Sequence, residues 1–170
     1  TENKTTLIPR AAGTSLAGQV VGNGIVVDIS RYFTNILEVN KEEKWVRVQP
    51  GVIRDDLNHY LKQFGLMFGP ETSTANRAMI GGMLGNNSCG LHSIVWGSAR
   101  DHVLEVKALL SDGSEVTFGK DDITVNGKDS FKSSIYHQLD ALLSDEKNQQ
   151  LIRDKFQKEK VHRRNTGYAL

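Results

Sequence analysis

Two stretches of small, uncharged residues carry most of the chemistry that this sequence can offer. The longer one spans residues 68–97, reads FGPETSTANRAMIGGMLGNNSCGLHSIVWG, and holds five glycines from Gly81 onward. Between Ala78 and Gly97 it has almost no charge, whereas a solvated loop of this length normally carries Lys or Glu. Glycine lets the backbone approach a ligand closely, and Ser, Thr and Asn offer short donors and acceptors without net charge. The stretch is therefore predicted to wrap a large, mostly neutral ligand.

The shorter stretch is PRAAGTSLAGQ, at residues 9–19, and it follows the β-prone run TTLI. Successive backbone N–H groups in such a loop can form an anion-binding nest. Thr14 and Ser15 would add hydroxyl donors, and Arg10 would add a positive charge. An ordinary surface turn is the alternative, and the composition of the loop leaves both interpretations open.

Two common phosphate motifs are excluded. Gly13 and Gly18 have the GxxxxG spacing of a Walker A loop, but Gln19 and Val20 follow where that motif needs Lys and Ser or Thr. A GxGxxG fingerprint is also absent from the sequence. Neither a P-loop ATPase nor a classical Rossmann dinucleotide site is supported.

Composition narrows the class of protein. The 170 residues carry a formal charge of +1, which argues against nucleic-acid binding through a basic face. No apolar run approaches the roughly 20 residues of a transmembrane helix. The single cysteine, Cys89, cannot form an intrachain disulfide, and alone it cannot hold zinc or an iron–sulfur cluster. We expect a cytoplasmic protein without a metal site, and peripheral attachment of a full-length protein to the inner membrane stays open.

The elements before the long stretch are predicted from hydrophobic periodicity. Residues 24–29 form an apolar run typical of a buried strand, and residues 36–39 and 45–49 are predicted strands around a charged turn. Apolar residues from Ile53 to Phe64 then recur with helical spacing, and Gly65 is the predicted C-cap.

The elements after the long stretch begin with a predicted hairpin, because an Asp-Gly turn separates two alternating runs. The predictions are strands at 102–110 and 115–118, a short strand at 123–125, and helices at 131–142 and 144–160. The basic run from Lys158 to Arg164 is interpreted as a solvated helix end. The sequence shows no terminal element after it, so we expect a chain cut from a longer protein at both ends.

The two stretches and DHVLEVKALLSDG at 101–113, in this order, closely resemble the flavin-binding domain of the vanillyl-alcohol oxidase and p-cresol methylhydroxylase superfamily. The likeness is greatest to its glycolate, D-lactate and D-2-hydroxyglutarate dehydrogenase branch. It covers nearly everything from Leu7 to Phe118, and HRRNTGYAL at the end also looks like the family. The resemblance implies an α+β fold with FAD between two lobes, residues 1–65 and 66–170. A cap domain for substrate and an iron–sulfur domain would lie outside this chain.

The resemblance also implies roles for individual residues toward a non-covalently bound FAD. The first loop would hold the pyrophosphate through Arg10, Ala11, Ala12, Gly13, Thr14, Ser15 and, just beyond, Gln19. Residues near the flavin and its ribityl chain would be Pro70, Thr72 and Ser73. The segment that wraps the cofactor would include Ile80, Gly81, Gly82, Asn86, Ser88, Gly90 and Ser93, with Trp96-Gly97 in place of a commoner Tyr-Gly.

Two departures from the family pattern have structural consequences. The first loop usually reads Arg-Gly-Gly-Gly, but here Ala11 and Ala12 replace two glycines. Alanine disfavours positive φ, so both are expected to adopt negative φ. Thr14 stands where members with covalent flavin often have His, so no histidyl link is expected from it. Cys89 is expected to be a small buried residue and not a flavin attachment.

The family implies oxidation of a 2-hydroxy acid to the 2-oxo acid by hydride transfer to flavin N5. The electron acceptor would be a quinone or an iron–sulfur carrier. No catalytic residue is assigned, because a structural role is the expectation for both His92 and His102. Without its cap domain, this fragment is expected to show no turnover of its own.

Two other functions stay open at this point. A non-flavin nucleotide- or sugar-phosphate-binding module would also use the first loop, but it does not need so long an uncharged wall. An interaction domain would use the basic residues 158–164 as its contact surface.

Overall fold

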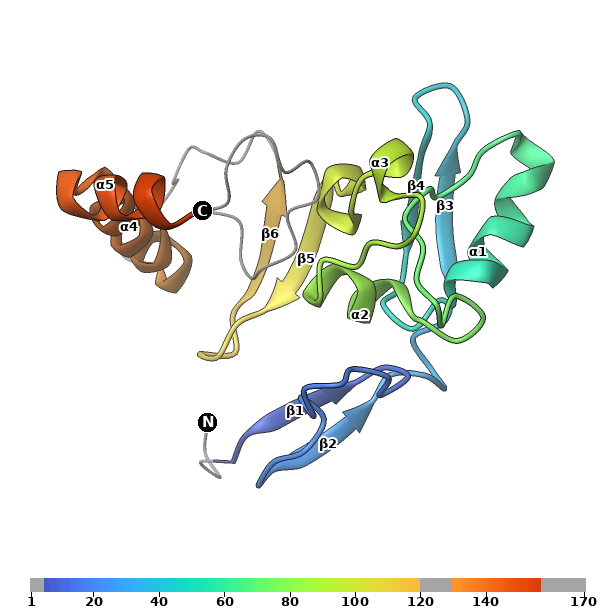
Figure 1. Ribbon diagram of the computed structural model, residues 1–170. Coiled ribbons are helices and arrows are strands. Elements are labelled where there is room, and N and C mark those ends of the chain that lie inside the picture. The colour runs from blue at the N-terminus through green and yellow to red at the C-terminus, as the bar shows by residue number, and fades with distance from the viewer. Residues whose placement is uncertain (1–4, 120–129, 157–170) are drawn as a thin grey trace. The chain divides into compact units, whose positions relative to one another are not determined.

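The computed structural model describes residues 5–119 and 130–156 (Figure 1). The chain divides into two compact units, residues 2–102 and 103–170. The elements of the first unit are strands β1 (Leu7–Arg10), β2 (Ile25–Asp28), β3 (Ile36–Asn40) and β4 (Trp45–Val48), helix α1 (Arg54–Leu61), the 3-10 helix η1 (Lys62–Phe64), the short helices α2 (Ile80–Gly85) and α3 (Ser93–Trp96), and the 3-10 helix η2 (Ala99–His102). The predicted lobe boundary near residue 65 stays a prediction.

Strands β3 and β4 form an antiparallel hairpin whose turn is fixed by side chains. Asn40 Oδ1 accepts from the Glu43 N–H at 2.9 Å, and Glu43 Oε2 accepts from the indole Nε1 of Trp45 at 2.7 Å. Lys44 completes the turn with a φ of 58°. The ladder runs from Asn40 opposite Trp45 to Ile36 opposite Val48, with one irregularity next to Ile36. Both predicted strands are confirmed.

Helix α1 covers this hairpin and creates the core of the first unit. Leu57 and Leu61 lie one turn apart on its buried face and pack with Val52. Around them lie half-buried side chains from the hairpin and from the segments beyond the helix: Ile36, Val39, Val46, Val48, Phe64, Leu66, Phe68 and Ile80. The chain leaves the helical region at Gly65, whose φ of 70° is the left-handed C-cap predicted from the sequence.

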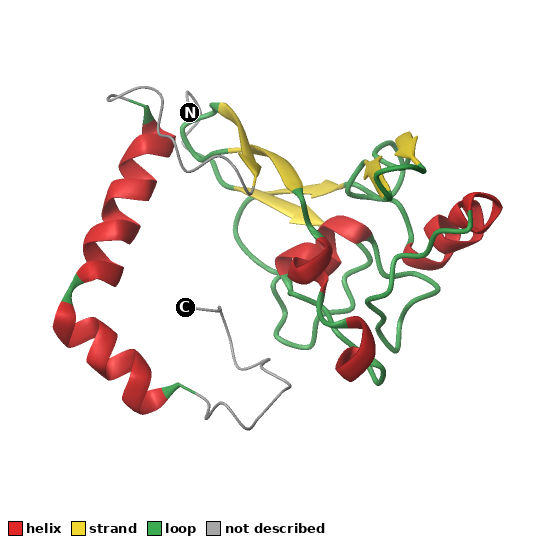
Figure 2. Ribbon diagram, turned by 90° about the horizontal axis from the view of Figure 1, so that it is seen from above, coloured by secondary structure: helices red, strands yellow, loops and turns green. Residues whose placement is uncertain are grey.

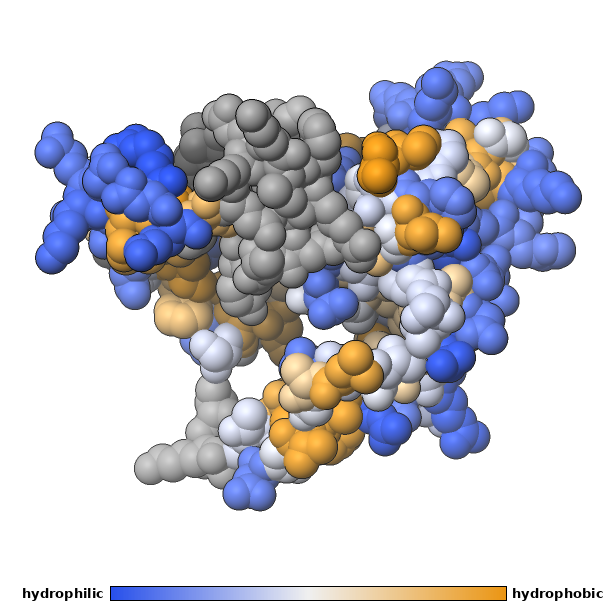
Figure 3. All heavy atoms as spheres, in the orientation of Figure 1, coloured by the Kyte–Doolittle hydropathy of each residue, from blue (hydrophilic) through white to orange (hydrophobic). Residues whose placement is uncertain are grey.

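Strands β1 and β2 pair in parallel, from Leu7 opposite Ile25 to Arg10 opposite Asp28. The prediction that residues 24–29 form a strand is confirmed, but the prediction that the strand is buried is wrong. Ile25 is 54% exposed and Val26 is 46% exposed. Within the described residues this sheet has two strands. The orange atoms over β1 and β2 in Figure 3 show the resulting apolar surface.

The second unit contains the hairpin β5 (Glu105–Leu109) and β6 (Glu115–Gly119), then helices α4 (Phe131–Ser144) and α5 (Glu146–Lys155). The predicted hairpin is confirmed, and its turn closes through Gly113, whose φ is 88°. Ser130 caps α4 and Asp145 caps α5, each through its side-chain oxygen, and Figure 2 shows the two helices joined by a short turn. The predicted strand at 123–125 and the basic run 158–164 lie outside the described residues.

Among the helices that the structure describes, none combines the length and apolar character that a bilayer crossing requires.

The core of the first unit depends on Leu57, which is 1% exposed. We expect Leu57→Ala to lower the free energy of unfolding by about 2 to 5 kcal/mol, because the truncation leaves a cavity under α1. Chemical denaturation of the purified protein measures the change. Leu37→Ala is the matched control, because Leu37 is 56% exposed on β3 and should cost below about 0.5 kcal/mol. Equal losses in the two variants would contradict this description of the core.

Candidate cofactor site

The first predicted loop leaves β1 at Arg10 and reaches β2 without a helix. The Arg10 carbonyl accepts from the Ile29 N–H at 3.0 Å, which fixes the start of the loop against the end of β2. Gly13 has a φ of 65°, and the Arg10 guanidinium lies so close that its Nε would be 3.2 Å from a Cβ on Gly13. Among the described residues other than glycine, only Lys44 and Asn87 have positive φ. The negative φ predicted for Ala11 and Ala12 is therefore confirmed.

This loop presents hydrogen-bond donors to its surroundings. In the described part of the chain, the backbone N–H groups of residues 11–17 donate to no acceptor. Thr14 and Ser15 are exposed, and Ser15 Oγ donates to the side-chain oxygen of Gln19. A run of unpaired N–H groups beside a guanidinium is a suitable binding place for a phosphate or pyrophosphate anion. The local donor set therefore fits the negatively charged part of FAD.

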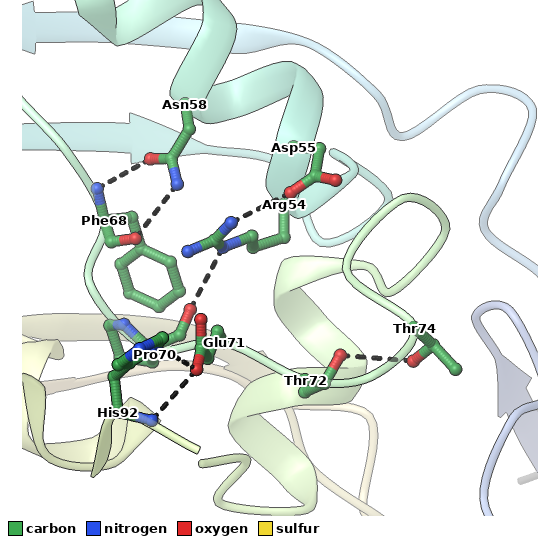
Figure 4. Close-up of polar contacts among 9 residues, drawn as sticks. All are labelled: Arg54, Asp55, Asn58, Phe68, Pro70, Glu71, Thr72, Thr74 and His92. Atoms are coloured by element: carbon green, nitrogen blue, oxygen red, sulfur yellow. Dashed lines mark hydrogen bonds and ion pairs between the residues drawn. The ribbon is translucent and has the colours of Figure 1, made fainter. Parts of the chain in front are cut away.

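The second predicted stretch begins with a segment held by α1 (Figure 4). The Asn58 side chain makes two bonds to Phe68, accepting from its N–H at 2.7 Å and donating to its carbonyl at 3.1 Å. Four residues earlier on the same helix, Arg54 Nε donates to the Pro70 carbonyl at 3.1 Å. Beyond Pro70, the hydroxyls of Thr72 and Thr74 lie 3.1 Å apart. Helix α1 thus fixes residues 68–70 at the entrance to the Gly-rich stretch.

The Gly-rich stretch is anchored by its backbone to residues 50–53. The N–H of Ile80 donates to the Val52 carbonyl at 2.9 Å, and the N–H of Gly81 donates to the Pro50 carbonyl at 2.8 Å. A Cβ on Gly81 would lie 2.5 Å from the Pro50 Cβ and 3.1 Å from the Pro50 carbonyl oxygen, so a side chain has no room there. The sequence predicted no helix in this stretch, but the structure forms the short helices α2 and α3 there. Backbone anchoring to residues 50–53 allows the glycine-containing helix α2 to form.

The two predicted loops meet at Gly82. A Cβ on Gly82 would lie 3.2 Å from the Cβ of Ala11, so the start of α2 faces the beginning of the first loop. The Gly82 N–H also donates to no acceptor among residues that the structure describes. The anion-binding donors and the uncharged wall are therefore parts of one surface, as the binding of a single large ligand requires.

Residues 86–100 are tied together around Ser88, which is buried. Its N–H donates to the Met83 carbonyl and its carbonyl accepts from the Ala99 N–H, both at 2.8 Å. Asn87, with a φ of 46°, accepts from the Arg100 N–H at 3.1 Å. Cys89 is half-buried, in a position more open than the buried one that we expected.

Glu71 joins the two halves of the stretch. Its Oε1 accepts from the His92 N–H at 2.9 Å and lies 2.7 Å from His92 Nδ1. The backbone hydrogen bond from His92 is the largest of the effects that lower the pKa of Glu71, and Arg54 adds a smaller electrostatic contribution. A Cβ on Gly90 would lie 2.4 Å from Glu71 Cγ, so glycine is needed for this close approach.

Asp101 closes the stretch at its far end. Its Oδ2 accepts from the N–H and hydroxyl of Ser98 at 2.7 and 2.9 Å, and the backbone bond is the main cause of its lowered pKa. His102 Nε2 lies 2.6 Å from the Trp96 carbonyl, and its ring meets Phe68 edge-on. Each histidine of the stretch therefore makes a hydrogen bond that fixes its position, and neither receives a catalytic role.

The predicted cofactor residues differ in exposure along the two stretches. The first loop places Ala11 and Ala12 half-buried, with Arg10, Gly13, Thr14, Ser15 and Gln19 exposed. In the second stretch Pro70 and Ser88 are buried, Thr72, Ile80, Gly81, Gly90, Ser93 and Gly97 are half-buried, and Ser73, Gly82, Asn86 and Trp96 are exposed. The residues that the sequence interpretation missed are Arg54, Asn58 and Glu71. Arg54 and Asn58 could have been found from the sequence, because both are polar residues on the predicted helix and lie outside its apolar stripe.

Residues 1–119 match the protein family described as the FAD binding domain. The chain belongs to this FAD-binding family. The resemblance stated from the sequence is thereby confirmed, and so is FAD as the family's cofactor. Which individual residues contact FAD stays a prediction.

Two curated relatives with sequence similarity are much longer than this chain. D-2-hydroxyglutarate dehydrogenase of Escherichia coli strain K12 is 41% identical over 173 residues, which cover 95% of this chain and 16% of the relative. Mitochondrial D-lactate dehydrogenase [cytochrome] of Kluyveromyces lactis is 35% identical over 114 residues, which cover 65% of this chain and 19% of the relative. The chain thus spans less than a fifth of the length of each.

Solved structures show the same fold. Alkyldihydroxyacetonephosphate synthase matches with a TM-score of 0.63 at 22% identity, covering 73% of this chain and 23% of that protein. The 6-hydroxy-D-nicotine oxidase of Arthrobacter nicotinovorans matches with a TM-score of 0.62 at 23% identity, covering 72% of this chain and 26% of that protein. The mixed helix and strand fold predicted from the sequence is therefore confirmed.

Within the described ranges, no group of three or more His, Cys, Asp or Glu side chains is arranged to hold a metal ion.

The contact between Ala11 and Gly82 gives a paired test of the junction between the loops. Gly82→Ala should weaken FAD binding, because two methyl groups 3.2 Å apart would push the first loop from α2. Combining it with Ala11→Gly should restore most of the affinity, measured by flavin fluorescence titration of the purified protein. Gly85→Ala is the matched control in the same helix, since nothing lies within 4 Å of its added Cβ. Failure of Ala11→Gly to rescue Gly82→Ala would contradict the assigned contact.

The lowered pKa of Asp101 predicts a pH dependence of stability. Its ionised form is favoured in the folded state, so this contribution is complete above the ordinary value of 3.8 and is lost as pH falls through the lowered pKa. Thermal unfolding of Asp101→Asn should therefore show a lower Tm at neutral pH and a shallower loss below pH 3.8 than the parent protein. Asp56→Asn, on the exposed side of α1, is the control. Parallel curves for parent and Asp101→Asn would show that the Ser98 contacts contribute nothing through charge.

Proposed function

We propose that this chain is the cofactor domain of a flavin-dependent dehydrogenase that oxidises a 2-hydroxy acid, of the D-2-hydroxyglutarate, D-lactate or glycolate type, to the 2-oxo acid. The observation that carries the proposal is the meeting of the donor-rich first loop with the uncharged stretch at Ala11 and Gly82. Relatives whose names specify D-2-hydroxyglutarate and D-lactate support the substrate class.

The first loop would hold the pyrophosphate of FAD non-covalently. Its N–H donors from Ala11 onward are open to an anion, and Thr14 and Ser15 add hydroxyls. Arg10, folded against Gly13, adds positive charge next to these donors. Amide donors of this kind bind phosphate without a dedicated lysine. Gln19, whose side chain contacts Ser15, would set the orientation of that hydroxyl.

The second stretch would cover the ribityl chain and the flavin ring. The residues assigned to this role are Pro70, Thr72, Ser73, Ile80, Gly81, Gly82, Asn86, Ser88, Gly90, Ser93, Trp96 and Gly97. Bound flavin supplies a two-electron acceptor at N5, while the protein supplies orientation and electrostatics. The residues of this chain hold the cofactor and exclude water from one side of it. We assign the base and the groups that bind the substrate carboxylate to other parts of the whole protein.

The whole protein would pass electrons to a quinone or an iron–sulfur carrier. We propose that the protein is cytoplasmic and that the full-length protein attaches to the inner membrane at most peripherally. We also propose that the FAD-binding domain consists of two lobes, residues 1–65 and 66–170.

Anaerobic titration of the purified full-length flavoprotein, with the parts that lie outside this chain, tests the function. D-2-hydroxyglutarate, D-lactate and glycolate are added in turn, and the visible absorbance of the flavin is followed. We expect one of these acids to bleach the flavin absorbance and to yield one molecule of 2-oxo acid per flavin. If that acid is D-2-hydroxyglutarate or D-lactate, its L enantiomer should leave the flavin absorbance unchanged. Bound flavin that none of the acids reduces would refute the substrate class. A purified protein that takes up no FAD would refute the proposed function as a whole.

A further inference from the structure

A single carboxylate bridges the two segments to which the flavin ring and ribityl chain are assigned. Glu71 Oε1 contacts both the backbone N–H and the ring Nδ1 of His92, at 2.9 and 2.7 Å. Next to His92, Gly90 lies so close to Glu71 that an added Cβ would be 2.7 Å from the Glu71 carbonyl oxygen. Backbone and side chain of Glu71 thus both fix the position of residues 90–92.

The other side of Glu71 is fixed by α1. Pro70, its neighbour in sequence, is buried and accepts from Arg54 at 3.1 Å. The Arg54 side chain is only 16% exposed and also contacts Asp55 Oδ1 at 2.9 Å, so it is held from two directions. Figure 4 shows these contacts in sequence, from α1 through Pro70 and Glu71 to His92. A rigid helix is therefore connected to residues 90–92 through one short segment.

We infer that Glu71 is a positioning residue for the cofactor: it sets the distance between residues 70–73 and residues 90–97 and so fixes the shape of the surface that receives the flavin and ribityl chain. The inference rests on the proposed FAD contacts of those two segments. It assigns Glu71 no contact with FAD or substrate, because the carboxylate acts through His92.

The chemistry of a carboxylate suits this role. An ionised oxygen can accept two N–H bonds at once, and such charge-assisted bonds are stronger than neutral ones. An amide at the same position keeps an acceptor oxygen of the same reach, although without the charge. Aspartate is one methylene shorter and would have to draw residues 90–92 toward Pro70. The requirement is therefore for length as well as for an acceptor.

The experiment compares Glu71→Ala, Glu71→Gln and Glu71→Asp in the purified holoprotein. Three quantities are measured: the Kd of FAD, the visible circular dichroism of bound flavin, and the Tm of the apoprotein. We expect Glu71→Ala to weaken FAD binding about tenfold or more and to change the flavin dichroism, because two charge-assisted bonds are lost. Glu71→Gln should stay within about threefold of the parent, whereas Glu71→Asp should not. Glu42→Ala, in the exposed β3–β4 turn, is the control.

The outcomes separate this inference from the proposed function. If the parent protein binds FAD, and Glu71→Ala binds it with the same affinity and the same flavin dichroism, the inference alone is overturned. A parent protein that binds no FAD would overturn both. If Glu71→Ala fails to fold, His92→Ala decides, since the His92 side chain is 60% exposed and its backbone N–H is retained. His92→Ala should then alter the flavin dichroism at an unchanged apoprotein Tm, and an unaltered spectrum would overturn the inference.

Discussion

Backbone hydrogen bonds from residues 50–54 hold the first unit together. This segment follows β4 and donates from Gly51 to the Phe33 carbonyl at 2.7 Å and from Arg54 to the Ala78 carbonyl at 2.9 Å. Its own carbonyls accept from Ile80 and Gly81, at the start of α2. Between these contacts lies Val52, 3% exposed in the core. The same few residues therefore connect the hydrophobic core to the start of α2 in the second stretch.

Close backbone approach explains why small residues are concentrated in the site. At Gly81 the neighbouring segment is backbone and proline ring, which cannot move aside for a side chain. At Gly90 the neighbour is Glu71, whose position is fixed by its own contacts. Glycine at these positions is thus required by the fold itself. Close packing within the fold is therefore a reason for these glycines besides the proposed binding of FAD.

The sequence predicted those elements whose signals are local. The period of α1, the Gly65 cap and the Asp-Gly turn of β5–β6 are each contained in a few consecutive residues, and all three are present. The prediction that β2 is buried was wrong. An apolar run indicates a preference for the strand conformation, but it does not show whether other elements pack against that strand. The role of Glu71 could not be predicted, since it depends on a contact with a residue 21 positions away. The meeting of Ala11 with Gly82 depends on tertiary structure in the same way.

The distribution of charge across the site limits what this domain can select. The first loop offers unpaired N–H groups and a guanidinium, which recognise phosphate in any nucleotide cofactor. Two carboxylates, Glu71 within the second stretch and Asp101 just beyond it, already accept hydrogen bonds from their own chain. Nothing in this arrangement distinguishes one 2-hydroxy acid from another. The fold is shared at 22–23% identity with proteins named for an alkyldihydroxyacetonephosphate synthase and a nicotine oxidase, and a shared fold does not specify a substrate.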